Sequence, residues 1–268
     1  MYDKDIILKM AEKSGLHYAD IIYDIDMTEI IATVFNFVRE KDLPAILFGG
    51  TAINRGFLRE KQRLSKDLDI MIRENPSDGI SMENVASQIH GLLSEKYIIG
   101  QREDENEGEE MLYSIKLFAK TKNGSNIKIS LYKEDLAFGY GYFEMHSLIE
   151  YAGYPYINPT KAKCYVFEGL MARKIYAMAE RKLYKDLYDS RYGLEVIKDY
   201  GAFNKALDGI TGNSSDVIMK RILDMDVESI TDEEDYETLT QSKYRESKAS
   251  MLKYIKMKIG IIMGRSKV

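Results

Sequence analysis

The sequence contains Ala45-Ile46-Leu47-Phe48-Gly49-Gly50-Thr51 and, after a connector rich in cations, Ser65-Lys66-Asp67-Leu68-Asp69-Ile70-Met71-Ile72. The apolar run from Ile46 to Phe48 has the length and composition of a buried strand. The two glycines that follow let the backbone approach a ligand closely and point N–H groups at an anion. Asp67 and Asp69 lie two residues apart in a second apolar run, so in a strand both carboxylates project from one face, about 6–7 Å apart. Paired carboxylates beside a phosphate-binding turn suit Mg²⁺, which binds a few carboxylates together with substrate oxygens.

The Asp-x-Asp spacing is a weak signal by itself, because the chain contains two further examples, Asp24-Ile25-Asp26 and Asp224-Met225-Asp226. The order of strand, Gly-Gly-Thr, basic connector and Asp-x-Asp strand carries more information. From these residues alone, two interpretations stay open: a phosphate and metal site, or a chance motif. Asp24 serves as the internal comparison, and we expect its replacement to be silent.

Two blocks of sequence carry a family resemblance. Gly49-Gly50-Thr51 with Ser65-Lys66-Asp67-Leu68-Asp69-Ile70 resembles motif I of the AbiEii-like toxin nucleotidyltransferases, members of the DNA polymerase β-like superfamily. The segment from Glu168 through Lys174 and Arg181 to Lys185-Asp186-Leu187-Tyr188-Asp189 resembles the downstream Lys…Arg…Asp-Leu-Tyr-Asp block of that family. The blocks occur in the family's order and together span about half of the chain.

Composition excludes several other classes of protein. The chain has 268 residues, and its net charge of −5 argues against a protein that coats nucleic acid over its whole surface. A single cysteine, Cys164, excludes an internal disulfide framework and suits a reducing cytoplasm. No apolar run approaches the length of a membrane span, and the first residues are not those of a signal peptide. We therefore expect a cytoplasmic protein with no membrane partner.

The order of predicted elements favours an α+β (α/β) fold with a mixed sheet. Helical periodicity covers most of residues 1–41, with a break near Gly15, and strand patterns follow at 46–48, 68–72, 97–99, 111–118 and 126–132. Residues 139–142 and 151–159 are interpreted as loop. Helices are predicted at about 164–182, 183–199, 202–209, 214–225 and 241–262. The resemblance implies a nucleotidyltransferase domain over residues 1–150, a helical domain over 151–268, and a site in the cleft between them.

Two cations in the second block occupy an apolar helical stripe. Lys174 and Arg181 fall in the middle of the stripe that contains Leu170 and Met178, where a charge is unfavourable unless it meets an anion. The alternative is that the aliphatic stem packs and the ammonium reaches water. Because Lys174→Ala takes a charge off the apolar stripe, it is expected to weaken NTP use and to raise thermal stability. The resemblance implies a part in activity, in which Lys174 binds the triphosphate as a point charge.

The acids of the second block also allow two interpretations. Asp186 lies at the edge of the next apolar stripe and Asp189 lies well off it, and each has a lysine four residues before it. Both could therefore form surface ion pairs, which contribute only tenths of a kcal/mol. Of the two, Asp186 is the stronger catalytic candidate. Likewise, the cations between Asn54 and Lys66 either guide polyanions to the site or lie on a solvated helix face.

The resemblance implies a Mg²⁺-dependent nucleotidyltransferase, with Mn²⁺ as a possible replacement. Asp67 and Asp69 would bind the metal, and Gly49, Gly50, Thr51, Ser65, Lys66, Lys174 and Arg181 would bind the NTP. Catalysis would rest on Asp67, Asp69, Lys174 and Asp186. The acceptor implied is an RNA such as tRNA, and an antitoxin encoded nearby would counter the toxin. The alternatives are transfer to a protein or small molecule without a toxic role, or an inactive binding module on the same scaffold.

The chain departs from the superfamily pattern at one point. Polymerase-β-like enzymes take a third carboxylate from the strand beside the Asp-x-Asp strand, and the candidate here is the strand from Ile127 to Tyr132. Its apolar face carries Ile127, Ile129 and Leu131, so the positions that face the site hold Lys128 and Ser130. The nearest acids, Glu134 and Asp135, follow the strand. We therefore expect a metal site with two carboxylates, in which Mg²⁺ arrives mainly with the NTP.

Overall fold

The computed structural model describes residues 4–75, 77, 79–105, 113–134, 138–148, 150, 160–231 and 246–265. The chain divides into two compact units, Met1–Tyr165 and Val166–Val268. Each unit is described by itself.

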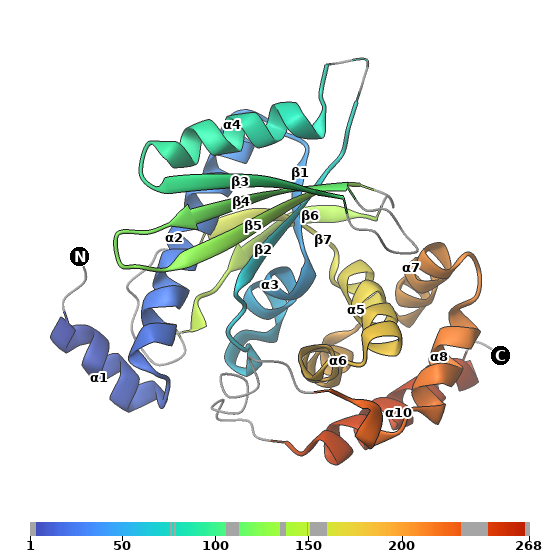
Figure 1. The fold of residues 1–268 in the computed structure, drawn as a ribbon. Helices are drawn as coiled ribbons and strands as arrows, with labels where there is room; N and C mark the ends of the chain where they lie inside the picture. Colours follow the sequence, from blue (N-terminus) through green and yellow to red (C-terminus); the bar gives the residue numbers. More distant parts are fainter. Residues whose placement is uncertain are drawn as a thin grey trace. The chain divides into compact units, whose positions relative to one another are not determined.

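The first unit is built on a seven-stranded mixed sheet (Figure 1). Its strands are β1 (Ala45–Phe48), β2 (Asp67–Ile72), β3 (Ile98–Glu105), β4 (Tyr113–Lys120), β5 (Asn126–Lys133), β6 (Tyr140–Met145) and β7 (Thr160–Tyr165). They lie in the order β3-β4-β5-β2-β1-β7-β6. The pairs β2–β5 and β1–β7 are parallel, and the other neighbours are antiparallel. The two strands of the first motif, β1 and β2, are therefore at the centre of the sheet.

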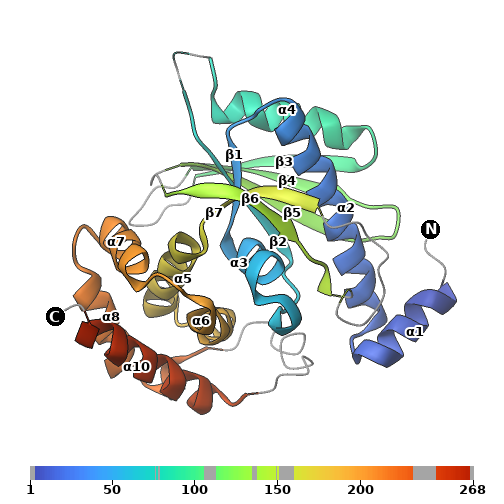
Figure 2. The ribbon, with the colours of Figure 1, turned by 180° about the vertical axis from the view of Figure 1, so that it is seen from behind.

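Most helices of the first unit pack against this sheet, whereas the N-terminal helix packs on the helix that follows it. The helices are α1 (Lys4–Ser14), α2 (Tyr18–Glu40), α3 (Gly49–Ile53) and α4 (Met82–Ser94), with a π-helical turn at Asn54–Leu58 and a 3₁₀ turn at Arg59–Lys61. Figure 2 shows α2 crossing one face of the sheet, where it packs on β7, while α4 contacts β3, β4 and β5. The core between them is apolar: Ile30, Val34, Leu68, Ile70, Ile129 and Leu131 are all completely buried. Burying a side chain of this kind contributes about 1.5–3 kcal/mol.

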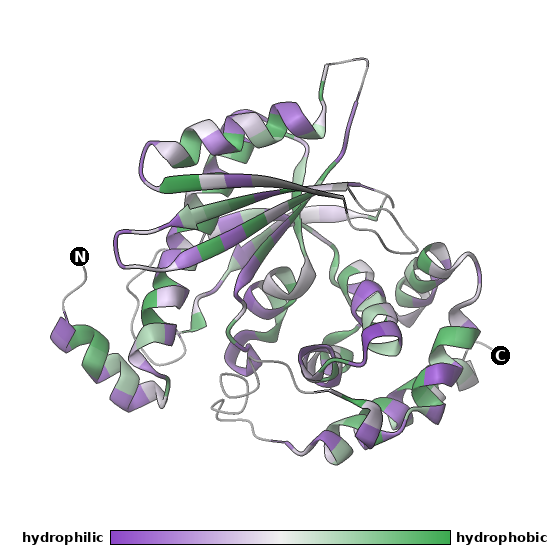
Figure 3. Ribbon diagram, viewed as in Figure 1, coloured by the Kyte–Doolittle hydropathy of each residue, from purple (hydrophilic) through white to green (hydrophobic). Residues whose placement is uncertain are grey.

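The second unit is helical. It comprises α5 (Phe167–Arg181), α6 (Tyr184–Val196), α7 (Tyr200–Thr211), α8 (Ser215–Asp224), a 3₁₀ turn (Val227–Ser229) and α10 (Lys248–Arg265). Helix α5 packs against α6, α7 and α8, and α10 packs against α6 and α8. Hydrophobic and hydrophilic residues alternate along α10 as they do along α1 and α4, which gives each helix one side to bury (Figure 3). Lys182 adopts a left-handed conformation (φ 54°) and ends α5, so the chain turns directly into α6.

The expected mixed α+β architecture and the helical second half are confirmed, but two strands were missed. The sequence predicts loop at 139–142 and a helix from about residue 164, whereas β6 and β7 form one edge of the sheet and β7 continues to Tyr165. The loop predicted over 151–159 lies outside the described residues. The boundary between the units therefore follows Tyr165 rather than residue 150. The sequence of β7 has the alternation that is typical of a strand. The structure follows this alternation, because Ala162 and Cys164 are buried while Lys161 is exposed. None of the helices in the described part of the chain is long and apolar enough to cross a membrane.

Candidate active site

The turn at Gly49 lies directly against one of the two carboxylates. Strands β1 and β2 are antiparallel neighbours in which Phe48 faces Asp69, and the chain leaves β1 at Gly49 with φ of 74°. A Cβ atom at position 49 would lie 2.6 Å from Oδ2 of Asp69. Glycine is needed here for two reasons, because the backbone is left-handed and because no side-chain atom fits beside the carboxylate.

Asp67 and Asp69 project from the same face of β2, as the spacing predicts. Both are half-buried, and they alternate with Leu68 and Ile70, which are completely buried on the opposite face. The strand thus places its apolar residues in the core and aligns two carboxylates beside the Gly49 turn.

The neighbouring strand β5 has the predicted position, and it brings a lysine to the site. In the parallel register, Lys128 lies beside Asp67 and Ser130 lies beside Asp69. The ammonium of Lys128 is 2.9 Å from Oδ1 of Asp67, and both side chains are partly exposed, at 37% and 43%. Ser130 is completely buried, and its hydroxyl finds no hydrogen-bond partner within the described parts of the chain. The sequence identified these two positions but not the contact between Lys128 and Asp67.

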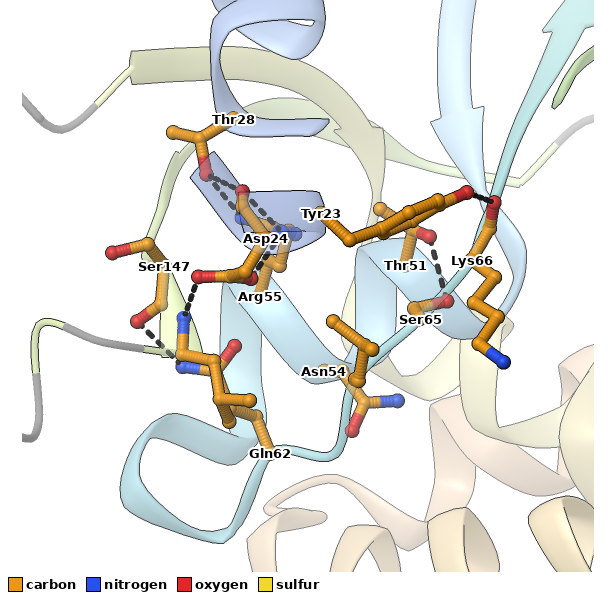
Figure 4. A network of polar contacts seen from close by, with 12 residues as sticks. Tyr23, Asp24, Thr28, Thr51, Asn54, Arg55, Gln62, Ser65, Lys66 and Ser147 are labelled. Atoms are coloured by element: carbon orange, nitrogen blue, oxygen red, sulfur yellow. Dashed lines mark hydrogen bonds and ion pairs between the residues drawn. The ribbon is translucent and has the colours of Figure 1, made fainter. Parts of the chain in front are cut away.

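The hydroxyls of the first motif hold its two halves together. The buried Thr51 hydroxyl is 2.8 Å from the hydroxyl of Ser65 and also donates to the backbone carbonyl of Asp67 (Figure 4). The phenol of Tyr23, from α2, donates to the backbone carbonyl of Lys66. Thr51 and Ser65 therefore position helix α3 against β2, and Figure 4 shows them pointing toward one another. Any contact with a nucleotide by this segment falls to the glycine backbone and to the Lys66 side chain.

The cationic connector between the two halves is largely interior. Arg55 is 2% exposed, and its guanidinium pairs with Asp24 and donates to the Thr28 hydroxyl at 2.7 Å (Figure 4). Arg63 is also buried. The interpretations of this segment as a solvated face or as a guide for polyanions are therefore wrong for these two arginines. Asp24 itself supports the fold, because its other oxygen accepts the backbone N–H of Leu148 at 2.9 Å. Its replacement is therefore expected to lower stability, while the expectation that transfer is unchanged stays a prediction.

The side-chain amide of Asn54 links the start of the connector to its end. The Asn54 side chain donates to the carbonyl of Gly50 at 2.9 Å and accepts the backbone N–H of Arg63 at 2.8 Å. Asn54 is completely buried, so it braces the start of α3 against the end of the connector. Sequence reasoning missed this residue, since nothing local marks an asparagine whose partner is nine positions away.

Glu134, considered above as a third metal ligand, is engaged elsewhere. Arg73 donates to it through Nε and, at 2.9 Å, through Nη2, and the Tyr165 hydroxyl donates to it at 2.7 Å. The hydrogen bonding of the Arg73 guanidinium to Glu134 raises the pKa of Arg73 above its usual value. A carboxylate held by two partners in this way is part of the scaffold. Asp135 lies outside the described residues.

The second block forms a buried ion cluster within the helical unit. The ammonium of Lys174, on α5, is 2.9 Å from Oδ1 of Asp186 and 3.0 Å from Oδ2 of Asp189, both on α6. Arg181 contacts the same Oδ1 of Asp186 at 2.9 Å. Both aspartates are completely buried and Lys174 is 7% exposed, so the charges compensate one another away from water. The Oδ2 atom of Asp186 accepts no hydrogen bond from the described residues.

This cluster corrects three expectations. Lys174 does not extend its charge into water, because it meets two carboxylates on the next helix. Asp189 is not on the surface, since it pairs with Lys174 and has no exposed area. Arg181 is not buried as its place in the apolar stripe suggests, because its side chain is 51% exposed at the end of α5 while its guanidinium contacts Asp186. Pairing across helices is invisible to a helical wheel drawn for one helix at a time.

The donor atoms near Asp69 fit a hard divalent cation. Two carboxylates and the Ser130 hydroxyl are oxygen donors of the kind that Mg²⁺ prefers, and the glycine at position 49 places no side chain against Oδ2 of Asp69. Within the described residues, no group of three or more His, Cys, Asp or Glu side chains could hold a metal ion. Such a site needs further oxygens from a substrate.

Comparison with known families identifies the chain. Residues 36–256 match the family described as the nucleotidyl transferase AbiEii toxin of type IV toxin–antitoxin systems, and this range contains both blocks. The chain belongs to the AbiEii family. It is therefore a member of a family of nucleotidyltransferase toxins, as the resemblance implied.

The fold agrees with that of a solved nucleotidyltransferase toxin. The chain is similar to MenT4, a nucleotidyltransferase toxin from Mycobacterium tuberculosis H37Rv, with a TM-score of 0.68 and 13% sequence identity. The match covers 98% of this chain and 90% of MenT4. At this identity the likeness concerns the fold, and it confirms the fold class predicted from the sequence. Comparison with curated proteins gives no match.

Proposed function

We propose that this AbiEii-family protein transfers a nucleotide from an NTP to an acceptor RNA such as tRNA, in the cytoplasm, as the toxin of a toxin–antitoxin pair. One observation carries the proposal: two carboxylates project from one face of β2, and one of them, that of Asp69, lies against a turn whose glycine admits no side chain. The family membership supports the reaction class, and the acceptor is our inference from the resemblance.

Asp67 and Asp69 would hold Mg²⁺, with Mn²⁺ as a substitute. When bound, the ion neutralises charge on the triphosphate and favours both attack on the phosphate and departure of pyrophosphate. The backbone of Gly49 and Gly50 would bind phosphate oxygens through N–H groups, and Lys66 would add a positive charge. Thr51 and Ser65 would act by holding this turn against β2, as their mutual hydrogen bond indicates.

Residues of the second unit would act on charge. Lys174 and Arg181 would balance negative charge of the nucleotide. Asp186 is completely buried, so it would act by holding these two cations, each of which lies 2.9 Å from its Oδ1. Catalysis of this kind depends on positioning and electrostatics more than on covalent chemistry.

The test is incubation with each labelled NTP, Mg²⁺ and either total RNA or total protein. We expect label in RNA, and we expect Asp67→Asn and Asp69→Asn to lower transfer by at least about a hundredfold, the scale of losing a key electrostatic contact. The matched control is Asp224→Asn, which changes an exposed residue of another Asp-x-Asp in the same way. Unfolding temperatures of all variants separate loss of function from loss of fold.

The other outcomes identify a different function. Label in the protein pool would assign a protein acceptor and overturn the RNA proposal. Absence of label from both pools, with NTP binding retained, would identify a binding module. Equal loss of activity in Asp224→Asn would show that the assignment of the motif is wrong. Rescue of growth by a co-expressed neighbouring gene is the expected result for the antitoxin.

A further inference from the structure

Lys128 occupies the place where this type of sheet could supply a further acid to the metal site. It is on β5, in register with Asp67 on the neighbouring parallel strand, and its ammonium is 2.9 Å from the Asp67 carboxylate. Strands in a sheet are about 4.8 Å apart, so neighbours in register on one face meet through their side chains. The next residue on that face, Ser130, is buried and has no hydrogen-bond partner in the described chain. Strand β5 thus contributes one cation and one uncommitted hydroxyl.

The ion pair between Lys128 and Asp67 contributes little to stability. Both side chains are more than a third exposed, and pairs of this kind are typically worth less than about 1 kcal/mol. The effect on the site is larger. The formal charges of Asp67, Asp69 and Lys128 add up to −1. With an acid at position 128 in place of the lysine, the sum would be −3. A site with so little negative charge attracts a divalent ion weakly and a second one hardly at all.

We infer that Lys128 is a fixed cation that takes the place of a second divalent ion, so that the site binds a single ion, delivered with the nucleotide. The inference rests on the proposed function and deepens it. A lysine suits this role because its ammonium is a compact point charge on a flexible stem. It compensates Asp67 while the site is empty of nucleotide.

The first experiment measures Mn²⁺ binding to the protein without nucleotide, by electron paramagnetic resonance of the free ion. Lys128→Met removes the charge and keeps the stem, and we expect it to tighten binding about tenfold. Lys128→Asp reverses the charge, and we expect it to tighten Mn²⁺ binding about a hundredfold. The control Lys161→Met makes the same change at an exposed lysine of β7, two strands away from β2, and is expected to leave Mn²⁺ binding unchanged.

The second experiment counts ions in the complex with a non-hydrolysable NTP analogue. The native protein is expected to bind one Mn²⁺ per analogue, and Lys128→Asp is expected to bind two. Unfolding by urea checks that the variants remain folded, which the weak pair predicts. Two ions in the native complex, or native Mn²⁺ affinity in a folded Lys128→Met, would overturn the inference.

A further variant, Asp67→Asn, distinguishes failure of this inference from failure of the proposed function. If Asp67→Asn leaves Mn²⁺ and analogue binding unchanged, the metal site itself is misassigned and the proposed function fails. If Asp67→Asn abolishes Mn²⁺ binding while Lys128→Met has no effect, only the role of Lys128 fails.

Discussion

Replacement of Gly49 by alanine tests the geometry of the site with one methyl group. The added Cβ would lie 2.6 Å from Oδ2 of Asp69, 3.3 Å from its Cβ and 3.4 Å from its Cγ. The Asp69 carboxylate must therefore move, while the Asp67 side chain two residues before it need not. We therefore expect Gly49→Ala to displace a proposed metal ligand in a chain that stays folded.

Two contributions set the magnitude. Alanine at a φ of 74° costs about 1–2 kcal/mol of stability, because a Cβ crowds the following carbonyl in the left-handed region. The movement of Asp69 affects activity more, since displacing a positioned group by about 1 Å lowers the rate about a hundredfold. We expect Gly49→Ala to lose about 1–2 kcal/mol in urea unfolding and at least about a hundredfold in transfer rate.

The control is Gly15→Ala, at the end of α1. Gly15 has nearly the same φ, 72°, but a Cβ there would meet nothing within 4 Å. It shares the backbone strain without the collision, so it should lose similar stability and keep full activity. Native transfer by Gly49→Ala would refute the reasoning, as would an equal loss of transfer in both variants.

Three further results are expected from buried groups. Lys174→Ala should destabilise the protein by about 3–5 kcal/mol in denaturant unfolding, because it leaves two buried carboxylates without a cation; unchanged or raised stability would contradict this. Asp24→Asn should lower the free energy of unfolding by a few kcal/mol, because it disrupts the buried pair with Arg55. Transfer should be unaffected at temperatures where the variant is folded. A variant as stable as the native protein would contradict this prediction. Burial raises the pKa of the Cys164 thiol well above its usual value, so alkylation at pH 8–9 should require unfolding, and fast labelling of the native protein would show that the thiol is accessible.

The sequence predicts the centre of the first unit well because the alternation of apolar and polar residues along a strand is a local property. An apolar run, two glycines and an Asp-x-Asp strand suffice to place Asp67 and Asp69 on one face, and the apolar face of β5 places Lys128 on the same side. Strand β6 is harder to predict, since glycine and tyrosine in alternation are equally typical of a loop. Strand β7 is easier to predict, since apolar and charged residues alternate along it.

What the sequence does not predict is which charges meet. Asp189 seemed a surface residue because Lys185 lies one turn away, yet its partner is Lys174 on another helix. Arg55 seemed part of a solvated face, yet Asp24, on α2, removes it from water. In both cases the partner lies outside the local segment, so composition and periodicity predict that a charge exists but not whether it is buried.

The parallel pairing of β2 with β5 also sets the time at which a newly made chain acquires its site. Helix α4 and strands β3 and β4 separate Asp67 from Lys128 in sequence, by about sixty residues. A ribosome adds about 5–20 residues per second, so roughly 3–12 seconds pass between the synthesis of the two. Strand β1 gains its second neighbour only when β7, at the end of the first unit, has emerged. During synthesis the chain therefore carries its acidic pair for seconds without the sheet that arranges it, and it becomes an enzyme only after most of its first unit has left the ribosome.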